Sequence, residues 1–289
     1  MSDLPDMSGR VCVVTGASAG IGTETALGLA QARATVVLVG RSPEKSSAAL
    51  DRIRRESGRD DVTLLLGDFS TMADVRRIAA EIVAVHPHVG VLVNNAGTAT
   101  RERRITADGM EETFAVNHAA PFLLTHLLRD ALVGAAPSRV VTVSSLAHRG
   151  GRLALTDLSY EQGWSSFQAY ADSKLANVLF TRELARRWAE TGVTSYAVHP
   201  GAVRTGLFRE NRLLGAIYPF VPFMKSPKQG ARTTLWCATA PALAGESGGY
   251  YAGGRRGSVA AQGQDDTAAE LLWDETARLV GVPSTSPEQ

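Results

Sequence analysis

The most constraining feature of the sequence is a regular alternation of short, β-branched apolar runs with longer segments of helical period. The runs expected as strands are Val11–Thr15, Thr35–Val39, Val62–Leu66, Val89–Val93, Arg139–Ser144 and Val193–Val198. The segments expected as helices are Ile21–Ala32, Ser46–Glu56, Met72–Val85, Phe122–Leu132 and Leu175–Thr191. Because the strand runs are apolar on both faces, helices must cover both sides of a parallel sheet. The pattern predicts a Rossmann-type, doubly wound α/β fold of about seven strands.

The chain is predicted to form a single domain over residues 10–281, because no repeat, low-complexity tract or linker divides it. Residues 1–9 are expected to be an N-terminal extension without the basic and apolar regions of a signal peptide. No apolar run approaches the ~20 residues that span a bilayer, so no stable membrane anchor is expected. Residues 282–289, with two prolines and small polar side chains, are expected to form a flexible tail.

The charge balance excludes a nucleic-acid partner, since 30 Lys and Arg oppose 29 Asp and Glu and leave a formal net charge of +1. Cys12 lies in a strand-like run and Cys237 in a helix-like one, and both are expected to act as small buried hydrophobes. A disulfide framework would need more cysteines, so a cytoplasmic location is expected. The six histidines show no metal-ligand spacing, and no metal is expected.

A glycine-rich loop, TGASAGIG at positions 15–22, joins the first predicted strand to the first predicted helix. Its glycines let the backbone turn tightly and approach a pyrophosphate, while the helix supplies unpaired N–H groups and positive dipole charge. The GxxxGxG spacing differs from the more common GxGxxG, and alone it also fits an ordinary strand-to-helix turn. The loop indicates a dinucleotide site.

The residues after the second and third strands bear on which nicotinamide cofactor binds. NAD-binding proteins normally carry a carboxylate after the second strand, where it holds the adenosine ribose, but VGRS at 39–42 has none. Arg41 can instead make charge-assisted contacts with a 2′-phosphate, so NADP(H) is expected, although an arginine there also suits a solvated loop. Asp68, in GDF at 67–69, can accept a hydrogen bond from adenine or act as a turn or cap residue.

The sequence YADSK at 170–174 opens a helical segment and places Tyr170 and Lys174 on one face, because residues four apart are neighbours on a helix. A tyrosine with a pKa near 10 is a poor acid or base at neutral pH, but a nearby cation moves that pKa toward the working range. YxxxK by itself is a weak signal, since many helices carry it by chance.

Other polar residues reach the same edge of the predicted sheet. NNAG at 94–97 closes the fourth strand, and Ser144 and Ser145 close the fifth, where a hydroxyl can polarise a substrate carbonyl. Asn117 lies in a helix-like stretch where a polar side chain is awkward, and it is expected to hold a water that relays protons to Lys174. HPGAVRT at 199–205 follows the sixth strand, where the nicotinamide would lie.

Together these motifs resemble those of the classical short-chain dehydrogenase/reductase family: TGxxxGIG at 15–22, NNAG at 94–97, Ser145, YxxxK at 170–174 and PGxVxT at 200–205. The resemblance spans residues 10–281. It implies a catalytic tetrad of Asn117, Ser145, Tyr170 and Lys174. Ser145 is preferred to Ser144 because the family's serine ends the V-S-S run.

The same resemblance places Thr205 against the nicotinamide carboxamide, and it places Arg41 where NADP-preferring members carry a basic residue. The cofactor contacts predicted from the loop, the strand ends and the resemblance are Gly16, Ser18, Gly20, Ile21, Gly22, Arg41, Asp68, Phe69, Asn95, Ala96, Gly97, Tyr170, Lys174, Pro200, Gly201, Val203 and Thr205.

Within the family, SSLAH at 144–148, SKLAN at 173–177 and LLW at 271–273 look most like the branch that contains retinol dehydrogenases and their soluble bacterial relatives. A membrane anchor of the kind found in many animal retinol dehydrogenases is not expected in this chain, which argues against a retinoid substrate. Bacterial members that resemble this chain include ketoreductases acting on polyketide antibiotics, among them anthracycline side-chain ketones. That analogy has no diagnostic residue behind it.

These observations predict an NADPH-dependent reductase, reversibly a dehydrogenase, that transfers hydride to the carbonyl of a bulky hydrophobic ketone or aldehyde. Tyr170 would protonate the oxygen, Ser145 would orient it, and Lys174 would tune Tyr170 and hold the nicotinamide ribose. Residues 149–168 and 206–225 are apolar enough to shape the pocket, the second as a substrate lid. Packing on the core or on another subunit, or shallow membrane contact, are the alternatives.

Several other functions compete with this prediction. A reductase of retinal-like or other lipophilic aldehydes is one alternative. An epimerase or dehydratase also uses a tyrosine and a lysine but normally needs a larger C-terminal domain than the residues after Thr205 provide. A non-catalytic NADP(H) sensor would have no need of Tyr170 beside Lys174. The protein is expected to be a monomer or a homodimer.

Overall fold

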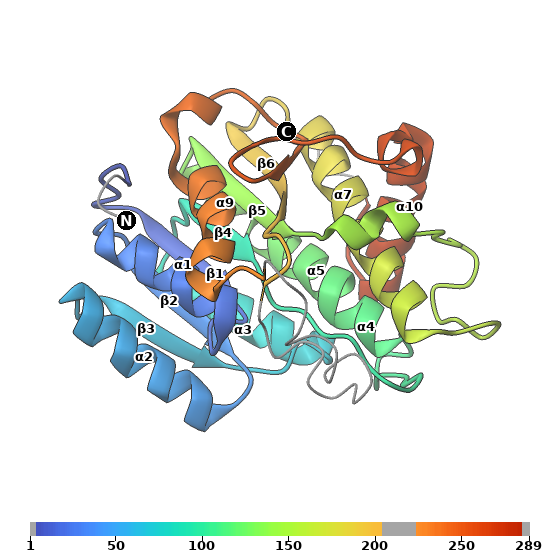
Figure 1. Cartoon of the computed structure of the whole chain (residues 1–289), viewed down its shortest axis with the longest axis horizontal. Coiled ribbons are helices and arrows are strands. Elements are labelled where there is room, and N and C mark those ends of the chain that lie inside the picture. Colours follow the sequence, from blue (N-terminus) through green and yellow to red (C-terminus); the bar gives the residue numbers. More distant parts are fainter. Residues whose placement is uncertain (1–3, 204–223, 285–289) are drawn as a thin grey trace.

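The backbone forms one eight-stranded sheet with helices on both faces (Figure 1), in a computed structural model that describes residues 4–203 and 224–284. The strand order is β3-β2-β1-β4-β5-β6-β7-β8, and every neighbouring pair is parallel except β7 with β8. The strands are β1 (Val11–Thr15), β2 (Thr35–Gly40), β3 (Val62–Leu66), β4 (Val91–Asn94), β5 (Ser138–Val143), β6 (Val193–His199), β7 (Gly249–Ala252) and β8 (Arg255–Arg256). The predicted doubly wound parallel sheet is confirmed.

The sheet has eight strands instead of about seven because a short hairpin extends its edge. Gly253 and Gly254 both have positive φ angles, 63° and 73°, which is the backbone that a tight two-residue turn requires. The turn reverses the chain, so Arg255 pairs with Ala252 in an antiparallel register. No apolar periodicity marks a two-residue strand.

The predicted helices form, and all but α3 have shifted ends. The helical segments flanking the sheet are α1 (Gly20–Gln31), α2 (Pro43–Ser57), α3 (Met72–Val85), α4 (Glu112–Phe114), the π-helical η1 (Ala115–Ala119), α5 (Ala120–Leu127), α6 (Arg129–Gly134), α7 (Ser166–Arg187), α9 (Pro227–Thr239) and α10 (Asp266–Val280). Short 3₁₀ turns are η2 (Leu146–Gly150), η5 (Pro241–Leu243) and η6 (Ala261–Gln264).

The largest differences from the predicted helices concern α5 and α7. The single helix expected over Phe122–Leu132 is interrupted at Leu128, whose backbone leaves the helical region between α5 and α6. Helix α7 begins nine residues before the predicted Leu175, because Ser165 caps it by accepting the Gln168 N–H. The YxxxK motif at 170–174 therefore begins one turn inside a long helix.

Alternate residues of each central strand enter opposite cores, as the two-sided apolar pattern predicts. In β1, Cys12 and Val14 pack with α1 and α9, whereas Val13 packs with α3, α5 and α7. Helix α10 lies against α7 on this second side (Figure 1), where Trp273 stacks on Phe180. Both faces of the sheet are covered, so its functional groups must lie at the strand ends.

The chain termini, as far as they are described, pack on this domain. The Met7 N–H donates to the Ala32 carbonyl, and the Met7 side chain is buried. At the other end, the Ser284 carbonyl accepts hydrogen bonds from the Trp273 indole and the Arg187 guanidinium. The domain and tail boundaries at 9/10 and 281/282 stay predictions.

Candidate active site

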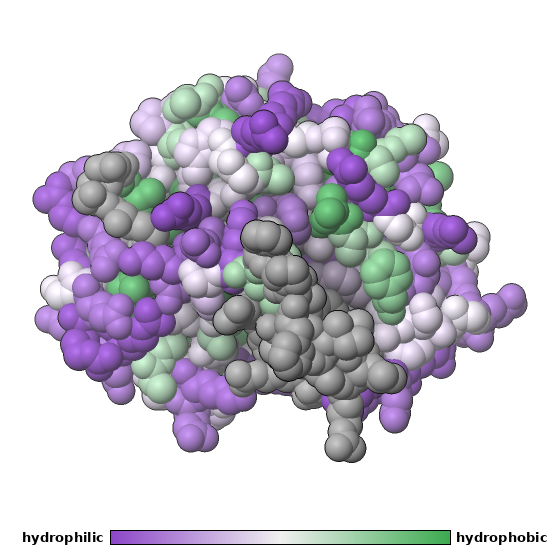
Figure 2. Space-filling model, viewed as in Figure 1, coloured by the Kyte–Doolittle hydropathy of each residue, from purple (hydrophilic) through white to green (hydrophobic). Residues whose placement is uncertain are grey.

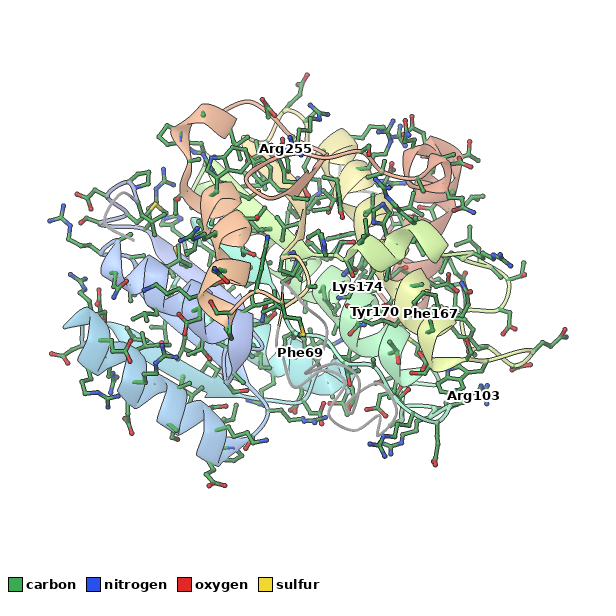
Figure 3. The ribbon with its side chains drawn as sticks, in the orientation of Figure 1. Phe69, Arg103, Phe167, Tyr170, Lys174 and Arg255 are labelled. Atoms are coloured by element: carbon green, nitrogen blue, oxygen red, sulfur yellow. The ribbon has the colours of Figure 1, made fainter. Side chains whose placement is uncertain are left out.

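The carboxyl ends of β1, β4, β5 and β6 lie side by side, because these strands are parallel neighbours in the sheet. Helix α7 packs beside them and carries Tyr170 and Lys174, which Figure 3 shows close together on its N-terminal half. The predicted motifs from four separate strands are thus brought to one edge.

The glycine loop has the tight geometry that the sequence predicts. Gly16 and Gly20 adopt positive φ angles of 64° and 63°. A Cβ on Gly22 would lie 2.3 Å from the Gly16 carbonyl oxygen, so only glycine fits where α1 meets the loop. Ala19 precedes the helix and offers no capping oxygen, and no acidic residue lies in the first turn. The N–H groups of α1 can therefore receive an anion.

Asn95 supports this loop from the end of β4. Its side-chain amide donates to the carbonyls of Thr15 (2.8 Å) and Gly16 (3.2 Å), and the Thr15 hydroxyl in turn accepts the Asn95 and Ala96 N–H groups. These bonds hold β1 and β4 together at the point where the cofactor would cross. The side-chain amide of Asn95 is therefore already hydrogen-bonded within the protein. The predicted contact of Asn95 with the cofactor would have to be made by its backbone.

Arg41 lies at the end of β2 with its side chain largely exposed and its guanidinium 3.7 Å from the Asp68 carboxylate. Asp68 also accepts the Ser70 N–H at 2.9 Å, which is the turn role that the sequence left open. The Phe69 side chain is buried in the core, so only its backbone could contact a ligand. The exposed Arg41 guanidinium has room to receive a further anion.

The two serines at the end of β5 play different structural roles. Ser144 is buried, and its hydroxyl donates to the Lys174 carbonyl at 2.7 Å, which ties α7 to β5. Ser145 is half-buried in extended backbone, and its Oγ accepts the Ala147 N–H at 3.2 Å. Because Oγ accepts this bond, the Ser145 proton can be donated to a substrate oxygen. This geometry favours Ser145 as the reacting serine.

Asn117 lies in the π-helical segment η1, a type of distortion that is frequent at functional sites. Its Oδ1 accepts the Thr98 N–H at 2.7 Å, and its Nδ2 donates to the Thr98 carbonyl and to the Ser173 hydroxyl, each at 2.9 Å. These bonds engage both ends of the amide, which leaves little capacity for the water relay that we expected of this side chain. In the structure it fixes the loop after β4 next to α7.

Asn117 and Lys174 approach each other across Gly97. A Cβ on Gly97 would lie 3.2 Å from Asn117 Oδ1 and 3.5 Å from Lys174 Nζ. Three of the predicted site positions therefore lie within one small space at the end of β4.

Lys174 is the buried cation of the site, with only 4% of its surface exposed. Its Nζ donates to the Val143 carbonyl at 3.1 Å and lies 5.6 Å from the centre of the Tyr170 ring. Burial lowers the pKa of Lys174 to about 8, because desolvation penalises the charged form. Tyr170 itself is half-buried, and its ring lies beside the lysine.

The turn after β6 completes the described edge. Gly201 has a φ of 92°, and a Cβ there would lie 2.9 Å from Lys225 Nζ. Val203 pairs with Lys225 in an isolated bridge. Lys225 is a residue that the sequence interpretation missed as a neighbour of this turn, because 21 residues separate the bridged pair. Thr205 and positions 206–223 of the lid predicted over 206–225 lie outside the described residues.

Most apolar residues of the 149–168 segment pack on the core. Core packing was the alternative to the prediction that this segment lines the substrate pocket. Leu158 is buried, and Leu155 packs against the core. Phe167 is instead 64% exposed, one turn before Tyr170 (Figure 3), and Leu146 beside Ser145 is 53% exposed. Figure 2 shows a largely hydrophilic face on which apolar surface forms small separate areas.

Two buried carboxylates hold this segment in place. Asp172, within the YxxxK motif, accepts hydrogen bonds from the Tyr160 hydroxyl at 2.8 Å and from the Arg152 N–H. Glu111 accepts the Trp164 indole N–H at 3.2 Å, and burial raises the pKa of this carboxyl. The sequence interpretation assigned a role to neither acid.

The fold and this site define an oxidoreductase that uses a nicotinamide cofactor. A family model described as short chain dehydrogenase matches residues 10–213, and the chain belongs to that family. Human retinol dehydrogenase 11 is 43% identical over 278 residues, covering 96% of this chain and 87% of the human protein. Bovine dehydrogenase/reductase SDR family member 13 is 43% identical over 286 residues, covering 96% of this chain and 75% of the bovine protein. The chain thus lies in the retinol-dehydrogenase-like branch that its motifs indicated.

Solved structures show the same fold. An uncharacterized protein from Mycobacterium paratuberculosis aligns with a TM-score of 0.80 and 32% identity, covering 99% of this chain and 98% of the other. A short chain dehydrogenase from Shigella flexneri, complexed with NADP, aligns with a TM-score of 0.68 and 25% identity, covering 86% of this chain and 99% of the other.

Among helices in residues 4–203 and 224–284, none combines the length and apolar character needed to cross a membrane. The same part of the chain contains no group of three or more His, Cys, Asp or Glu side chains placed to hold a metal ion.

Proposed function

We propose that the protein is an NADPH-dependent carbonyl reductase, reversibly an alcohol dehydrogenase, acting on bulky hydrophobic ketones or aldehydes. The observation that carries this proposal is the buried Lys174 ammonium beside the half-buried Tyr170 ring, with Ser145, whose Oγ accepts the Ala147 N–H, at the same sheet edge. NADPH would supply the hydride that converts the carbonyl carbon to a carbinol. Tyr170 would supply the accompanying proton to the oxygen.

The residues of the site fit this cofactor. The uncapped start of α1 and the glycine cradle suit a pyrophosphate, and the exposed Arg41 guanidinium suits a 2′-phosphate. Two solved relatives of this fold contain NADP or NADPH, which supports the same choice. Asn95, Gly97, Pro200, Gly201 and Val203 remain proposed contacts, together with the other predicted cofactor residues.

Each proposed catalytic residue has a distinct task. Ser145 would donate its proton to the substrate oxygen and orient it. Lys174 would lower the pKa of the Tyr170 phenol through its charge and hold the nicotinamide ribose. Asn117 would hold the loop after β4 next to α7 through its hydrogen bonds to Thr98 and Ser173.

The exposed Phe167 and Leu146 side chains flank Tyr170 and Ser145 and favour an apolar substrate. A polyketide-type ketone such as an anthracycline side chain is one proposal, by analogy with bacterial ketoreductases. A retinal-like aldehyde is the second, and it is favoured by the identity to retinol dehydrogenases.

The decisive experiment measures NADPH oxidation by wild type and Tyr170→Phe with polycyclic ketones, small aliphatic ketones and retinal. We expect wild type to reduce at least one bulky carbonyl compound, and Tyr170→Phe to bind NADPH normally without turnover. Normal NADPH binding without turnover of any carbonyl by wild type would favour a non-catalytic sensor. Turnover of a sugar nucleotide instead would favour an epimerase or dehydratase.

A further inference from the structure

The peptide group that follows Ser145 is held from both sides by histidine rings. The oxygen of this peptide group, which is the backbone carbonyl oxygen of Ser145, accepts a hydrogen bond of 2.6 Å from His148 Nδ1. The N–H of the same group, on Leu146, donates a hydrogen bond of 3.2 Å to His199 Nδ1. His148 lies in η2 and His199 ends β6, so the two rings belong to different elements and are 51 positions apart in the sequence.

The bonding partners determine the tautomer of each ring. A carbonyl oxygen only accepts, so His148 must carry its proton on Nδ1. A backbone N–H only donates, so His199 must present an unprotonated Nδ1. Burial lowers the pKa of both rings, to about 4 for His199, where Lys225 and His148 add to the effect of burial. Both histidines are thus neutral at pH 7, as the two bonds require.

We propose that His148 and His199 are positioning residues that clamp the Ser145–Leu146 peptide plane and thereby aim the Ser145 hydroxyl at the substrate oxygen. This inference rests on the proposed reduction of a carbonyl. Ser145 itself is half-buried and lies at the junction of β5 with the 3₁₀ turn η2. The His148 backbone N–H also donates to the Ser145 carbonyl, at 3.2 Å, but the Leu146 N–H is held by the His199 ring. The clamp fixes both polar atoms of one rigid peptide plane, which leaves that plane little freedom to rotate.

The surroundings of His148 support a built arrangement over a chance contact. The ring is fully buried and packs against Tyr250 of β7, with ring centres 4.8 Å apart. Both His148 Nε2 and the Tyr250 hydroxyl are buried without a hydrogen-bond partner in the described structure. The buried ring therefore uses its single satisfied nitrogen to hold the Ser145 carbonyl.

The test compares variants that keep or remove the required atom. His148→Asn retains an N–H donor near the Nδ1 position, whereas His148→Phe retains a ring without a donor. His199→Asn retains an acceptor oxygen, and His199→Phe does not. Tyr250→Phe is the matched control, because it changes the same buried ring contact and leaves both clamp bonds intact.

We expect His148→Phe and His199→Phe to lower kcat roughly 10- to 100-fold, the scale of an ångström-sized misplacement of a reacting group. The Asn variants should recover most of kcat, and Tyr250→Phe should match wild type. The Kd for NADPH should stay unchanged, and the primary deuterium isotope effect with 4-deuterated NADPH should rise in the Phe variants. Because both rings hold one plane, the double Phe variant should lose little more than each single one.

Two kinds of failure remain distinguishable. Equal kcat in wild type and both Phe variants, or equal losses in the Phe and Asn variants at each position, would overturn the clamp while leaving the reductase assignment intact. Absence of carbonyl turnover in wild type would remove the proposed function itself. In that case crystal structures of the Phe variants still test the clamp, which predicts a rotated Ser145–Leu146 peptide, and an unrotated peptide would overturn it.

Discussion

The ammonium of Lys174 lies 5.6 Å from the centre of the Tyr170 ring, in a position from which its charge favours the phenolate form. The burial that strengthens the effect of this charge on Tyr170 also destabilises the charged form of Lys174. Burial lowers the pKa of Lys174 from 10.5 to about 8, which corresponds to a cost of roughly 3 kcal/mol for holding the charge at pH 7. We therefore expect the buried Lys174 charge to lower the free energy of unfolding while it supports activity.

Lys174→Met should therefore abolish carbonyl reduction and raise the free energy of unfolding at pH 7, because methionine fills similar space without a buried charge. Between pH 8 and 10.5 the folded protein releases this proton while the unfolded chain retains it, so wild-type stability rises relative to the variant. Below pH 8 the cost is fully present. Urea unfolding of both proteins from pH 7 to 10 measures the difference. A wild type more stable than Lys174→Met at pH 7 would contradict this prediction.

The adjacent serines should separate stability from catalysis. Ser145→Ala is expected to lower kcat roughly 10²- to 10³-fold, the usual loss for a donor to a developing oxyanion, with the midpoint of thermal unfolding nearly unchanged. Ser144→Ala removes the bond to the Lys174 carbonyl and should cost about 1–3 kcal/mol of stability. Both variants are measured by steady-state kinetics and by thermal unfolding, and each variant is the control for the other. The reverse pattern would show that Ser144 is the reacting serine.

Arg41→Asp should discriminate between the cofactors. Loss of charge-assisted hydrogen bonds to a 2′-phosphate is expected to raise the Kd for NADPH roughly 10- to 100-fold, with a much smaller change for NADH. Fluorescence titration with both cofactors measures the ratio. Arg55→Asp, an exposed position at the end of α2, is the control for the change in net charge. Equal losses for NADPH and NADH would refute the assignment of Arg41.

Asp172→Ala should destabilise the fold more than Tyr160→Phe. The first change leaves the Tyr160 hydroxyl and the Arg152 N–H without their acceptor, at an expected cost of about 2–4 kcal/mol. The second removes one bond and should cost about 1 kcal/mol. Denaturant unfolding measures both. A loss below 0.5 kcal/mol (roughly the scatter of neutral surface changes) for Asp172→Ala would show that other contacts hold the segment.

Much of the fold could be predicted from local pattern. The bounds of β1, β3 and α3 agree with the predicted segments, because two-residue and 3.6-residue periodicities are properties of neighbouring residues. It could also be predicted that the glycine loop, Ser145 and the turn after β6 lie close together, because the carboxyl ends of adjacent parallel strands share one edge of the sheet. The proximity of Tyr170 and Lys174 could be predicted from their spacing alone, because residues four apart are neighbours on a helix.

Only the tertiary structure decided how these groups are supported. The bonding of the Asn117 amide to Thr98 and Ser173, the Asp172–Tyr160 contact and the two histidines around Ser145 join residues from distant parts of the chain. Such pairs leave no periodic trace in the sequence, because each depends on how whole elements pack and on which polar atoms burial leaves to be satisfied. The sequence by itself determined which groups reach the sheet edge, and packing decided which of them face a substrate and which hold the others in place.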